Sequence, residues 1–309
     1  MTNHSAILFE PWNLGDTIIA FATAIQDPDR IALACNTRWH SILRCAAQGQ
    51  QSPELIPVDL GYVTRKKIFG HQQFKPQQID GKAAVLSIRG DIRDYRAARS
   101  LFPASRIKMN GWIPFLAKRS SWIDLPFTRS WLPVRNRYRA WADLAEIDWD
   151  RIVTFYHRKR CSRRARVAIH IGAQWKSKQY PHAAELVQIL QKSSDVQVIA
   201  APGDPLPPGL LESDVSRLID GDLVGELLSC THLIANDSGP MHLGALLRCR
   251  TIVLSNRAAI AEWLPPEVIA VQPGDSPRGY HAPRLSDTVF AFWPPPQQVV
   301  ESLFSSMLN

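Results

Sequence analysis

The segment "IANDSGPMHLGAL", residues 234–246, joins an apolar strand-like run to a helical pattern and decides the fold. The apolar run stops at the polar letters NDSGP, and the helix begins directly after them. Asp237 or Ser238 can cap this helix, and Pro240 suits its first turn. Capping does not require the acid, the hydroxyl and the glycine together, nor His242 in the first turn. Because a helix N-terminus carries unpaired N–H groups and partial positive charge, the segment also predicts an anion site.

Strand-like and helix-like runs alternate in both halves of the chain. In the first half we expect strands at 6–10, 30–35 and 83–90, and helices at 17–25 and 38–47. In the second half we expect strands at 166–172, 196–201, 232–235 and 251–255, and helices at 182–192, 223–230, 240–247 and 296–308. A Pro-, Trp- and Arg-rich stretch at 103–165 separates the two series and is interpreted as a connector. This alternation predicts two α/β domains with parallel sheets and a cleft between them.

Length and composition are those of a globular protein. The 309 residues suffice for two cores, and 45% of them are hydrophobic and 21% charged. No apolar run reaches the about 20 residues of a membrane-spanning helix. The N-terminus has no basic region followed by a long apolar stretch, so we expect no secretory signal. Five scattered cysteines without a CxxC pair predict reduced thiols in a cytoplasmic protein.

Charge is distributed unevenly along the chain. Residues 1–166 hold 27 Lys and Arg against 14 Asp and Glu, whereas residues 167–309 hold 9 against 14. A basic half is typical of a domain that faces nucleic acid, a phosphorylated glycolipid or a membrane surface. Solvated surface charge explains any single cluster equally well. The candidate clusters are Arg65-Lys66-Lys67 and Arg93, Arg96 and Arg99, the latter sharing one face if the segment is helical.

The sequence NLGD, residues 13–16, directly follows the first expected strand. Ligands of open parallel sheets bind beyond the carboxyl ends of the strands. Gly15 would let the backbone approach a ligand closely, and Asp16 would place a carboxylate at the helix start. The simpler explanation is that Asp16 is the N-cap of the helix over 17–25, a common use of aspartate. No GxGxxG motif accompanies this turn, so an ordinary dinucleotide site is not expected.

The sequence HIGAQWKSKQYPH, residues 170–182, repeats the order of strand, loop and helix. Lys176 and Lys178 would suit phosphate contacts as point charges. Ser177 and the backbone at Gly172-Ala173 would add hydrogen bonds. An ordinary solvated loop is the alternative interpretation.

The sequence DGD, residues 220–222, has the DxD form with which metal-dependent sugar transferases bind a divalent cation. It directly precedes a predicted helix, so Asp222 as the N-cap is the simpler explanation. We therefore predict no metal site.

Together the three loop motifs resemble those of glycosyltransferase family 9, the ADP-heptose:lipopolysaccharide heptosyltransferases. Members of that family carry LGD before an apolar helix, then HPGA…SKRWP, then NDSGPMHLAAALG, in the order seen here. The resemblance implies a GT-B fold, in which two Rossmann-like domains have parallel sheets facing a central cleft. It implies an acceptor-binding domain at 1–160, a nucleotide-sugar-binding domain at 161–295, and a C-terminal helix at 296–309 that packs back on the first domain.

The resemblance also implies a reaction, which is inverting transfer of heptose from ADP-heptose to a lipopolysaccharide core acceptor. The ADP-sugar is a substrate, and neither a cofactor nor a metal is implied. The acceptor would be an anionic glycolipid, met by a cytoplasmic enzyme attached peripherally to the inner membrane face. Asp16 matches the catalytic base, and Lys178 the lysine that binds the donor phosphates. Expected donor-binding residues are Gly172, Ala173, Lys176, Ser177, Lys178, Asp237, Ser238, Gly239 and His242, and expected acceptor-binding residues are Gly15, Arg65 and Arg93.

The segment after the strand TIVLS departs from the family pattern. It reads NRAAIAEWLPP where the family has FGPTDP, which leaves the nucleotide and the sugar open. One alternative is another GT-B glycosyltransferase with a different nucleotide-sugar or a non-lipopolysaccharide acceptor. A nucleic-acid-binding protein is a second, but no helix-turn-helix, RRM or KH pattern accompanies the Arg-rich stretch 151–166. A non-catalytic sugar-nucleotide binder is a third alternative. The presence of both Asp16 and Lys178 argues against it.

Overall fold

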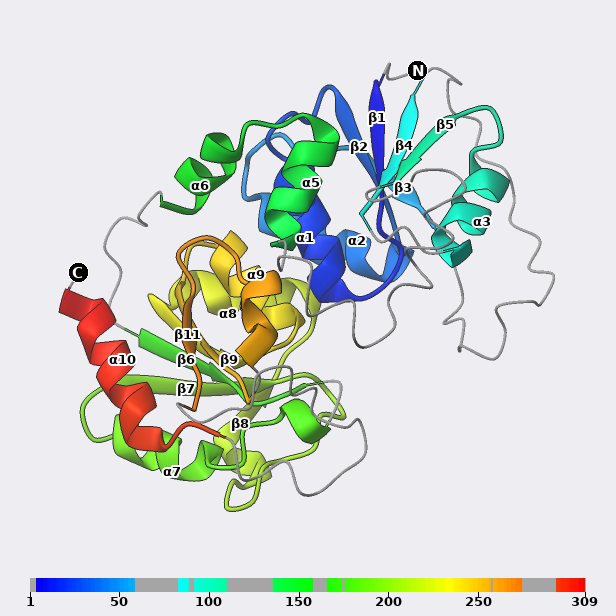
Figure 1. Ribbon diagram of the computed structural model, residues 1–309. Coiled ribbons are helices and arrows are strands. Elements are labelled where there is room, and N and C mark those ends of the chain that lie inside the picture. The colour runs from blue at the N-terminus through cyan, green and yellow to red at the C-terminus, as the bar shows by residue number, and fades with distance from the viewer. Residues whose placement is uncertain are drawn as a thin grey trace. The chain divides into compact units, whose positions relative to one another are not determined.

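The chain forms two compact α/β units, residues 1–152 and 153–309 (Figure 1). The computed structural model describes residues 4–58, 83–88, 92–109, 136–157, 166–173, 176–256, 258–273 and 293–308. The units divide inside helix α6 (Trp149–His157), earlier than the boundary predicted at residue 160. The reason is that Phe155 is buried in the second unit, where the guanidinium of Arg248 lies 5.2 Å from its ring centroid.

The first unit is built on a five-stranded parallel sheet with strand order β3-β2-β1-β4-β5. Its strands are β1 (Ala6–Phe9), β2 (Ile31–Cys35), β3 (Leu55–Pro57), β4 (Ala84–Ser87) and β5 (Arg106–Met109). The central strand β1 is buried along its whole length, as expected of an apolar run in a parallel sheet covered on both faces. The sequence pattern predicted β1, β2 and β4, and missed the two short edge strands.

Helices of the first unit are α1 (Leu14–Ala24), α2 (His40–Ala47), α3 (Ile92–Leu101), α5 (Arg137–Ala145) and the first part of α6, with a 3-10 turn η1 (Thr37–Trp39). Helix α5 packs on α1 (Figure 1). Its residues Tyr138 and Trp141 are completely buried. Strand β5 and helices α5 and α6 occupy the stretch interpreted as a connector, so that interpretation was wrong. In α5 six of the nine residues are buried, and they are Tyr138, Ala140, Trp141, Ala142, Leu144 and Ala145.

The second unit contains a six-stranded parallel sheet with strand order β11-β10-β9-β6-β7-β8. Its strands are β6 (Arg166–His170), β7 (Asp195–Ala200), β8 (Val215–Arg217), β9 (His232–Asn236), β10 (Arg250–Leu254) and β11 (Ile269–Val271). Strands β6 and β9 are direct neighbours, although 61 residues lie between the end of β6 at His170 and the start of β9 at His232. The loops that follow these two strands therefore start side by side.

Helices of the second unit are α7 (Ala183–Leu190), α8 (Asp220–Ser229), α9 (Gly239–Leu246) and α10 (Pro296–Leu308), with 3-10 turns η3 (Lys176–Lys178), η4 (Glu212–Asp214) and η5 (Ala258–Glu262). Helix α10 was expected to pack back on the first domain. That packing stays a prediction; within the second unit α10 contacts α7, β10 and β11, and its buried residues Val299 and Leu303, four positions apart, belong to the apolar core of that unit. Among the described residues no helix is both long and apolar enough to cross a bilayer, and no cysteine forms a disulfide.

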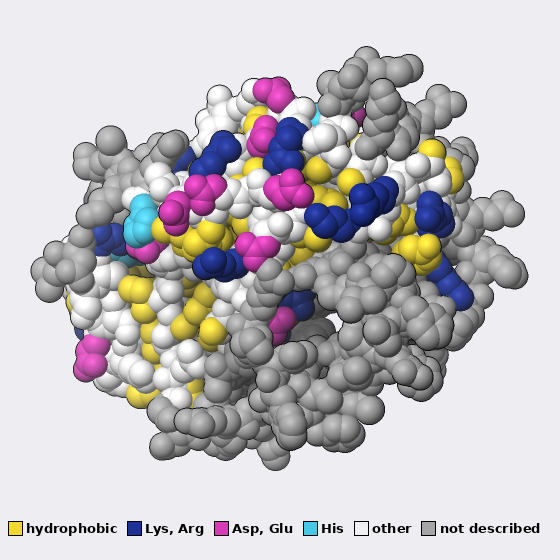
Figure 2. Space-filling view, turned by 45° about the horizontal axis from the view of Figure 1, so that its top comes forward, with side chains coloured by type: hydrophobic (Ala, Val, Ile, Leu, Met, Phe, Trp, Pro, Cys, Tyr) yellow, Lys and Arg dark blue, Asp and Glu magenta, His cyan; other side chains and the backbone are white. Residues whose placement is uncertain are grey.

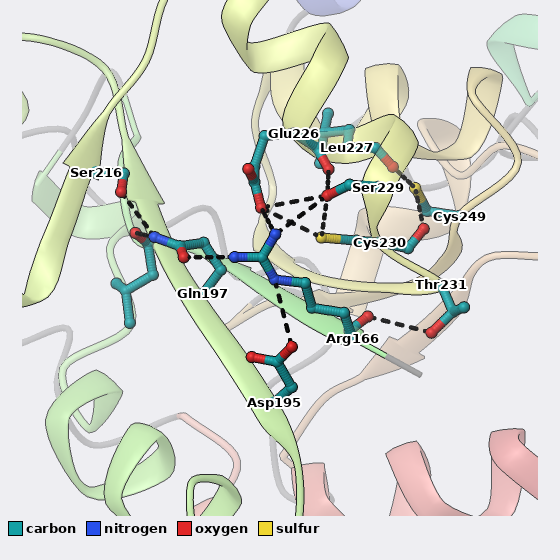
Figure 3. A network of polar contacts seen from close by, with 11 residues as sticks. Arg166, Asp195, Gln197, Ser216, Glu226, Leu227, Ser229, Cys230, Thr231 and Cys249 are labelled. Carbon is teal, nitrogen blue, oxygen red and sulfur yellow. Dashed lines mark hydrogen bonds and ion pairs between the residues drawn. The ribbon is translucent and has the colours of Figure 1, made fainter. Parts of the chain in front are cut away.

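Arg166 ties together the amino ends of neighbouring strands in the second sheet (Figure 3). Its Nη1 lies 2.9 Å from Glu226 Oε1 on α8, and its Nη2 donates to Gln197 Oε1 on β7 at 2.7 Å. Gln197 in turn donates to Ser216 Oγ on β8 at 2.7 Å. This network lies at the edge of the sheet opposite to the strand ends that carry the loop motifs, so we assign it to stability.

Replacing Arg166 by Met should lower the free energy of unfolding by about 1–3 kcal/mol, because Glu226 and Gln197 lose a charged partner. Thermal denaturation measures the change, which should amount to several degrees. The matched control is Lys192→Met, an exposed cation of the same unit that should leave the melting temperature unchanged. Equal melting temperatures for the two variants would contradict a stabilising role for the network.

Candidate functional site

The buried side chain of Asn236 joins the second and third loop motifs at the carboxyl edge of the second sheet. It is 1% exposed and is the last residue of β9. Its Nδ2 donates to the carbonyl oxygens of Ile171 and Gly172 at 2.9 and 3.2 Å, and its Oδ1 accepts from the backbone N–H of Tyr180 at 3.1 Å. One amide therefore fixes both ends of the loop after β6 against the end of β9.

Lys178 and Asp237, one from each loop, are in direct contact. The lysine Nζ lies 2.9 Å from Asp237 Oδ2 and donates to the Asp237 carbonyl oxygen at 3.1 Å. Their side chains are only 20% and 10% exposed, so solvent screens this ion pair weakly. The pair lies directly before the first turn of α9, where two further predicted residues, Gly239 and His242, are found.

The turn before α9 is not capped in the predicted way. Ser238 is the N-cap residue, but its side chain makes no capping hydrogen bond. The Ser238 hydroxyl donates instead to the carbonyl oxygen of Asn236 at 3.2 Å. Pro240 lies in the first turn as expected, and His242 is buried there. The Ser238 side chain therefore does not cap α9, and that part of the capping prediction was wrong.

The glycine of the HIGA sequence is required by a neighbouring carboxylate. A Cβ at Gly172 would lie 1.8 Å from Asp204 Oδ2, an oxygen that accepts from the N–H of Ala201 at 3.0 Å. Two residues before this glycine, His170 ends β6, and burial lowers the pKa of its imidazole to about 4. The ring is therefore neutral at pH 7, and its Nδ1 has no hydrogen-bond partner among the described residues.

A second buried asparagine, Asn256, holds the second half of the loop after β6. Asn256, which is 2% exposed, donates from Nδ2 to the carbonyl oxygen of Ser177 at 2.9 Å. The buried Ser177 hydroxyl has no hydrogen-bond partner within the described part of the chain. Ala173 is buried beside Gly172, and Lys176 begins the turn η3, although its side chain lies outside the described residues.

In the first unit, helix α1 begins at Leu14, earlier than predicted. Asn13 is the N-cap residue, Gly15 is half-buried, and Asp16 is the third residue of the first turn. The interpretation of Asp16 as the N-cap was therefore wrong. Its carboxylate is 8% exposed, and Oδ1 lies 3.7 Å from Nη1 of Arg137, the first residue of α5. A buried carboxylate beside a cation is an unusual feature for a helix start that needs only a cap.

The turn that leads into α1 is anchored by a buried acid, Asp94, which belongs to none of the sequence motifs. Asp94 on α3 accepts from Trp12 Nε1 at 2.8 Å and from Ser87 Oγ at 3.0 Å. Trp39 Nε1 donates to the Trp12 carbonyl oxygen at 3.1 Å. These bonds fix the backbone just before Asp16.

The structure does not describe the side chains of the two arginines predicted to bind the acceptor. Arg65 lies outside the described residues, and Arg93 is on α3 with an undescribed side chain. The helical spacing expected for the arginine cluster is confirmed, and Arg96 and Arg99 are exposed on α3. Arg99 donates to the carbonyl oxygens of Pro103 and Ser105 at 3.0 and 3.3 Å, so part of its role is to hold the end of the helix.

The predicted DxD acids both lie in the first turn of α8. Ile219, not Asp222, is the N-cap residue, so the predicted cap was wrong. Asp220 has a positive φ of 42°. No cluster of three or more His, Cys, Asp or Glu side chains suited to a metal is present among the described residues.

A scan of family models found no match to the chain, and neither did a search of curated proteins. Solved structures are similar over nearly the whole length. The E. coli ADP-heptose lipopolysaccharide heptosyltransferase II is 15% identical, with a TM-score of 0.60 and 98% of both chains covered. A glycosyl transferase family 9 protein from Veillonella parvula is 14% identical, with a TM-score of 0.59 and coverage of 100% of this chain and 99% of the other. E. coli heptosyltransferase WaaC with ADP-2-deoxy-2-fluoro heptose is 14% identical, with a TM-score of 0.55 and coverage of 96% and 99%. The two parallel-sheet α/β units therefore have the GT-B fold of these glycosyltransferases.

Proposed function

We propose that the protein is an inverting glycosyltransferase that transfers heptose from ADP-heptose to a lipopolysaccharide core acceptor. The observation that carries the proposal is the Lys178–Asp237 pair before the first turn of α9, which Asn236 assembles from two loops. The similar E. coli heptosyltransferase WaaC was solved with ADP and with an ADP-heptose analogue, which supports the same class of donor.

Donor binding is assigned to the carboxyl edge of the second sheet. The Lys178 ammonium and the N–H groups at the start of α9 supply the positive potential that a diphosphate requires. The buried Ser177 hydroxyl adds a donor for a ligand oxygen. The Asp237 carboxylate beside Lys178 is suited to accept hydrogen bonds from sugar hydroxyls. This arrangement stabilises the leaving diphosphate without a metal, so the proposed reaction is metal-independent.

The chemical step is assigned to Asp16 of the first unit as general base. The acceptor hydroxyl oxygen forms a bond to the anomeric carbon while the bond from that carbon to the diphosphate oxygen breaks. The hydroxyl proton passes to the Asp16 carboxylate and ADP leaves, so the anomeric configuration is inverted. The burial of this carboxylate, 8% exposed, suits a base that must meet the acceptor away from competing water.

The acceptor is proposed to be an anionic glycolipid, bound by the first unit at the cytoplasmic face of the membrane. The basic surplus of residues 1–166 supports this. On the face drawn in Figure 2, the described Lys and Arg side chains form no single continuous patch, and several of them lie beside Asp or Glu. Many basic residues of this half, including Arg65, Lys66 and Lys67, lie outside the described residues, so the proposal rests on the charge surplus in the sequence.

Titration of the full-length protein with ADP, UDP and GDP in the presence of EDTA tests the donor site. We expect ADP to bind at least about tenfold more tightly than the other two, a difference of about 1.4 kcal/mol, with or without the chelator. Tighter binding of another nucleotide would support the alternative of a GT-B transferase with a different donor. A requirement for magnesium or manganese would contradict the metal-independent mechanism and direct attention to Asp220 and Asp222.

A further inference from the structure

Arg137 faces the Asp16 carboxylate from a different helix. Its Nη1 lies 3.7 Å from Asp16 Oδ1, and the two side chains are 19% and 8% exposed. Sequence motifs gave no reason to select this arginine, which follows Asp16 by more than a hundred residues. The pair therefore exists only because α5 packs against α1.

The position of Arg137 on its own helix is electrostatically unfavourable. It is the first residue of α5, and the first turn of that helix contains no acidic residue. The positive end of a helix dipole disfavours a cation there, whereas it favours the carboxylate of Asp16 in the first turn of α1. Helix stability thus does not account for an arginine at this position, but the facing carboxylate does.

The guanidinium is carried by a rigid element. The Asn136 side chain caps α5 by accepting from the backbone N–H groups of Tyr138 and Arg139 at 3.0 and 3.3 Å. Tyr138 and Trp141 are completely buried and fix the helix in the first unit. A charge held by such a helix can set the orientation of a neighbouring side chain, which a solvated lysine cannot do as well.

We infer that Arg137 is a positioning residue that holds the ionised Asp16 carboxylate in the orientation needed to receive the acceptor proton. This inference rests on the proposed function, in which Asp16 is the general base. Arg137 acts through Asp16 and does not contact substrate. Because a displacement of about 1 Å in a reacting group can cost about 100-fold in rate, loss of the guanidinium should affect turnover more than substrate binding.

A double-mutant cycle with Arg137→Met and Asp16→Asn tests the inference, using kcat and the acceptor KM of the full-length enzyme. Arg137→Met should lower kcat about 10- to 100-fold and leave the acceptor KM within about twofold. Arg137→Lys should recover part of the rate. The double variant should be no slower than Asp16→Asn alone, because residues that act as one unit are not additive.

The matched control is Arg139→Met on the same helix, which removes an exposed guanidinium lying 5.7 Å from the Trp149 ring. It should retain wild-type kcat. Thermal denaturation and ADP titration of each variant show whether a loss of kcat comes from a loss of folded protein. If Arg137→Met does not fold, the kcat of Arg137→Lys is compared with that of the wild type instead.

Two results would overturn the inference while leaving the base assignment intact. One is wild-type kcat in Arg137→Met together with an inactive Asp16→Asn. The other is a raised acceptor KM in Arg137→Met, with losses that multiply in the double variant, since Arg137 would then bind the acceptor itself. Wild-type turnover in Asp16→Asn is a different failure, because it removes the general base and the inference with it.

Discussion

Replacing Asp16 by Asn should lower kcat by about 100-fold or more, since loss of a general base typically costs 10²–10⁴ in rate. Asparagine keeps the shape of the side chain but cannot accept the proton of the acceptor hydroxyl. Because the proposed donor site belongs to the second unit, the affinity for ADP should stay within about twofold of the wild type, a difference well below 1 kcal/mol. Initial rates of ADP release at saturating donor and acceptor measure the effect.

The control for this variant is another aspartate of the same unit that also pairs with an arginine. Asp27 Oδ2 lies 2.7 Å from Arg30 Nε, and both side chains are about one-third exposed. Asp27→Asn should leave kcat unchanged, because an exposed ion pair of this kind contributes little even to stability. If Asp16→Asn and Asp27→Asn had the same near-normal turnover, Asp16 would not be the base.

Replacing Lys178 by Ala should weaken ADP binding by about 10- to 100-fold, equivalent to the about 1.5–3 kcal/mol of a hydrogen bond to a charged group. The loss has two sources. The diphosphate loses its cation, and the Asp237 carboxylate, now without the ammonium 2.9 Å away, repels the incoming anion. Calorimetric titration at two salt concentrations measures the affinity.

Two lysines serve as comparisons for this variant. Lys192→Ala removes an exposed cation of the same unit and should leave the ADP affinity unchanged. Lys176→Ala should be milder than Lys178→Ala, because the resemblance matches Lys178, not Lys176, to the phosphate-binding lysine. Equal and small effects at all three positions would indicate that the loop is merely solvated and that the diphosphate binds elsewhere.

The sequence was most informative about the centres of the two sheets. Apolar runs such as AILF in β1 and HLIA in β9 are long enough to identify a strand buried on both faces. The edge strands β3, β8 and β11 have three residues each, too few to show a period. Helix α5 was missed because its turns are rich in arginine, although Tyr138 and Trp141 make it one of the best-buried helices of its unit.

For the candidate site too, the residues within local sequence motifs could be predicted, and those that matter through long-range contacts could not. The resemblance implied that Lys178 and Asp237 both bind the donor, and in the structure the Lys178 Nζ lies 2.9 Å from Asp237 Oδ2. Asn256 and Arg137 were missed because their significance comes from contacts with residues far away in sequence. Asn236 was visible at the end of an apolar run, but only the structure shows that it bonds both ends of another loop.

The most direct test of the proposed function is a mass-spectrometric transfer assay with ADP-heptose and a lipopolysaccharide core acceptor. The wild-type enzyme in EDTA should add heptose to the acceptor and release an equal amount of ADP, and the product should have the inverted anomeric configuration. Asp16→Asn, run in parallel, should give little product while still binding ADP. ADP-heptose that stays intact with the wild-type enzyme, or that is consumed at a rate independent of acceptor with no glycosylated product, would contradict the proposal.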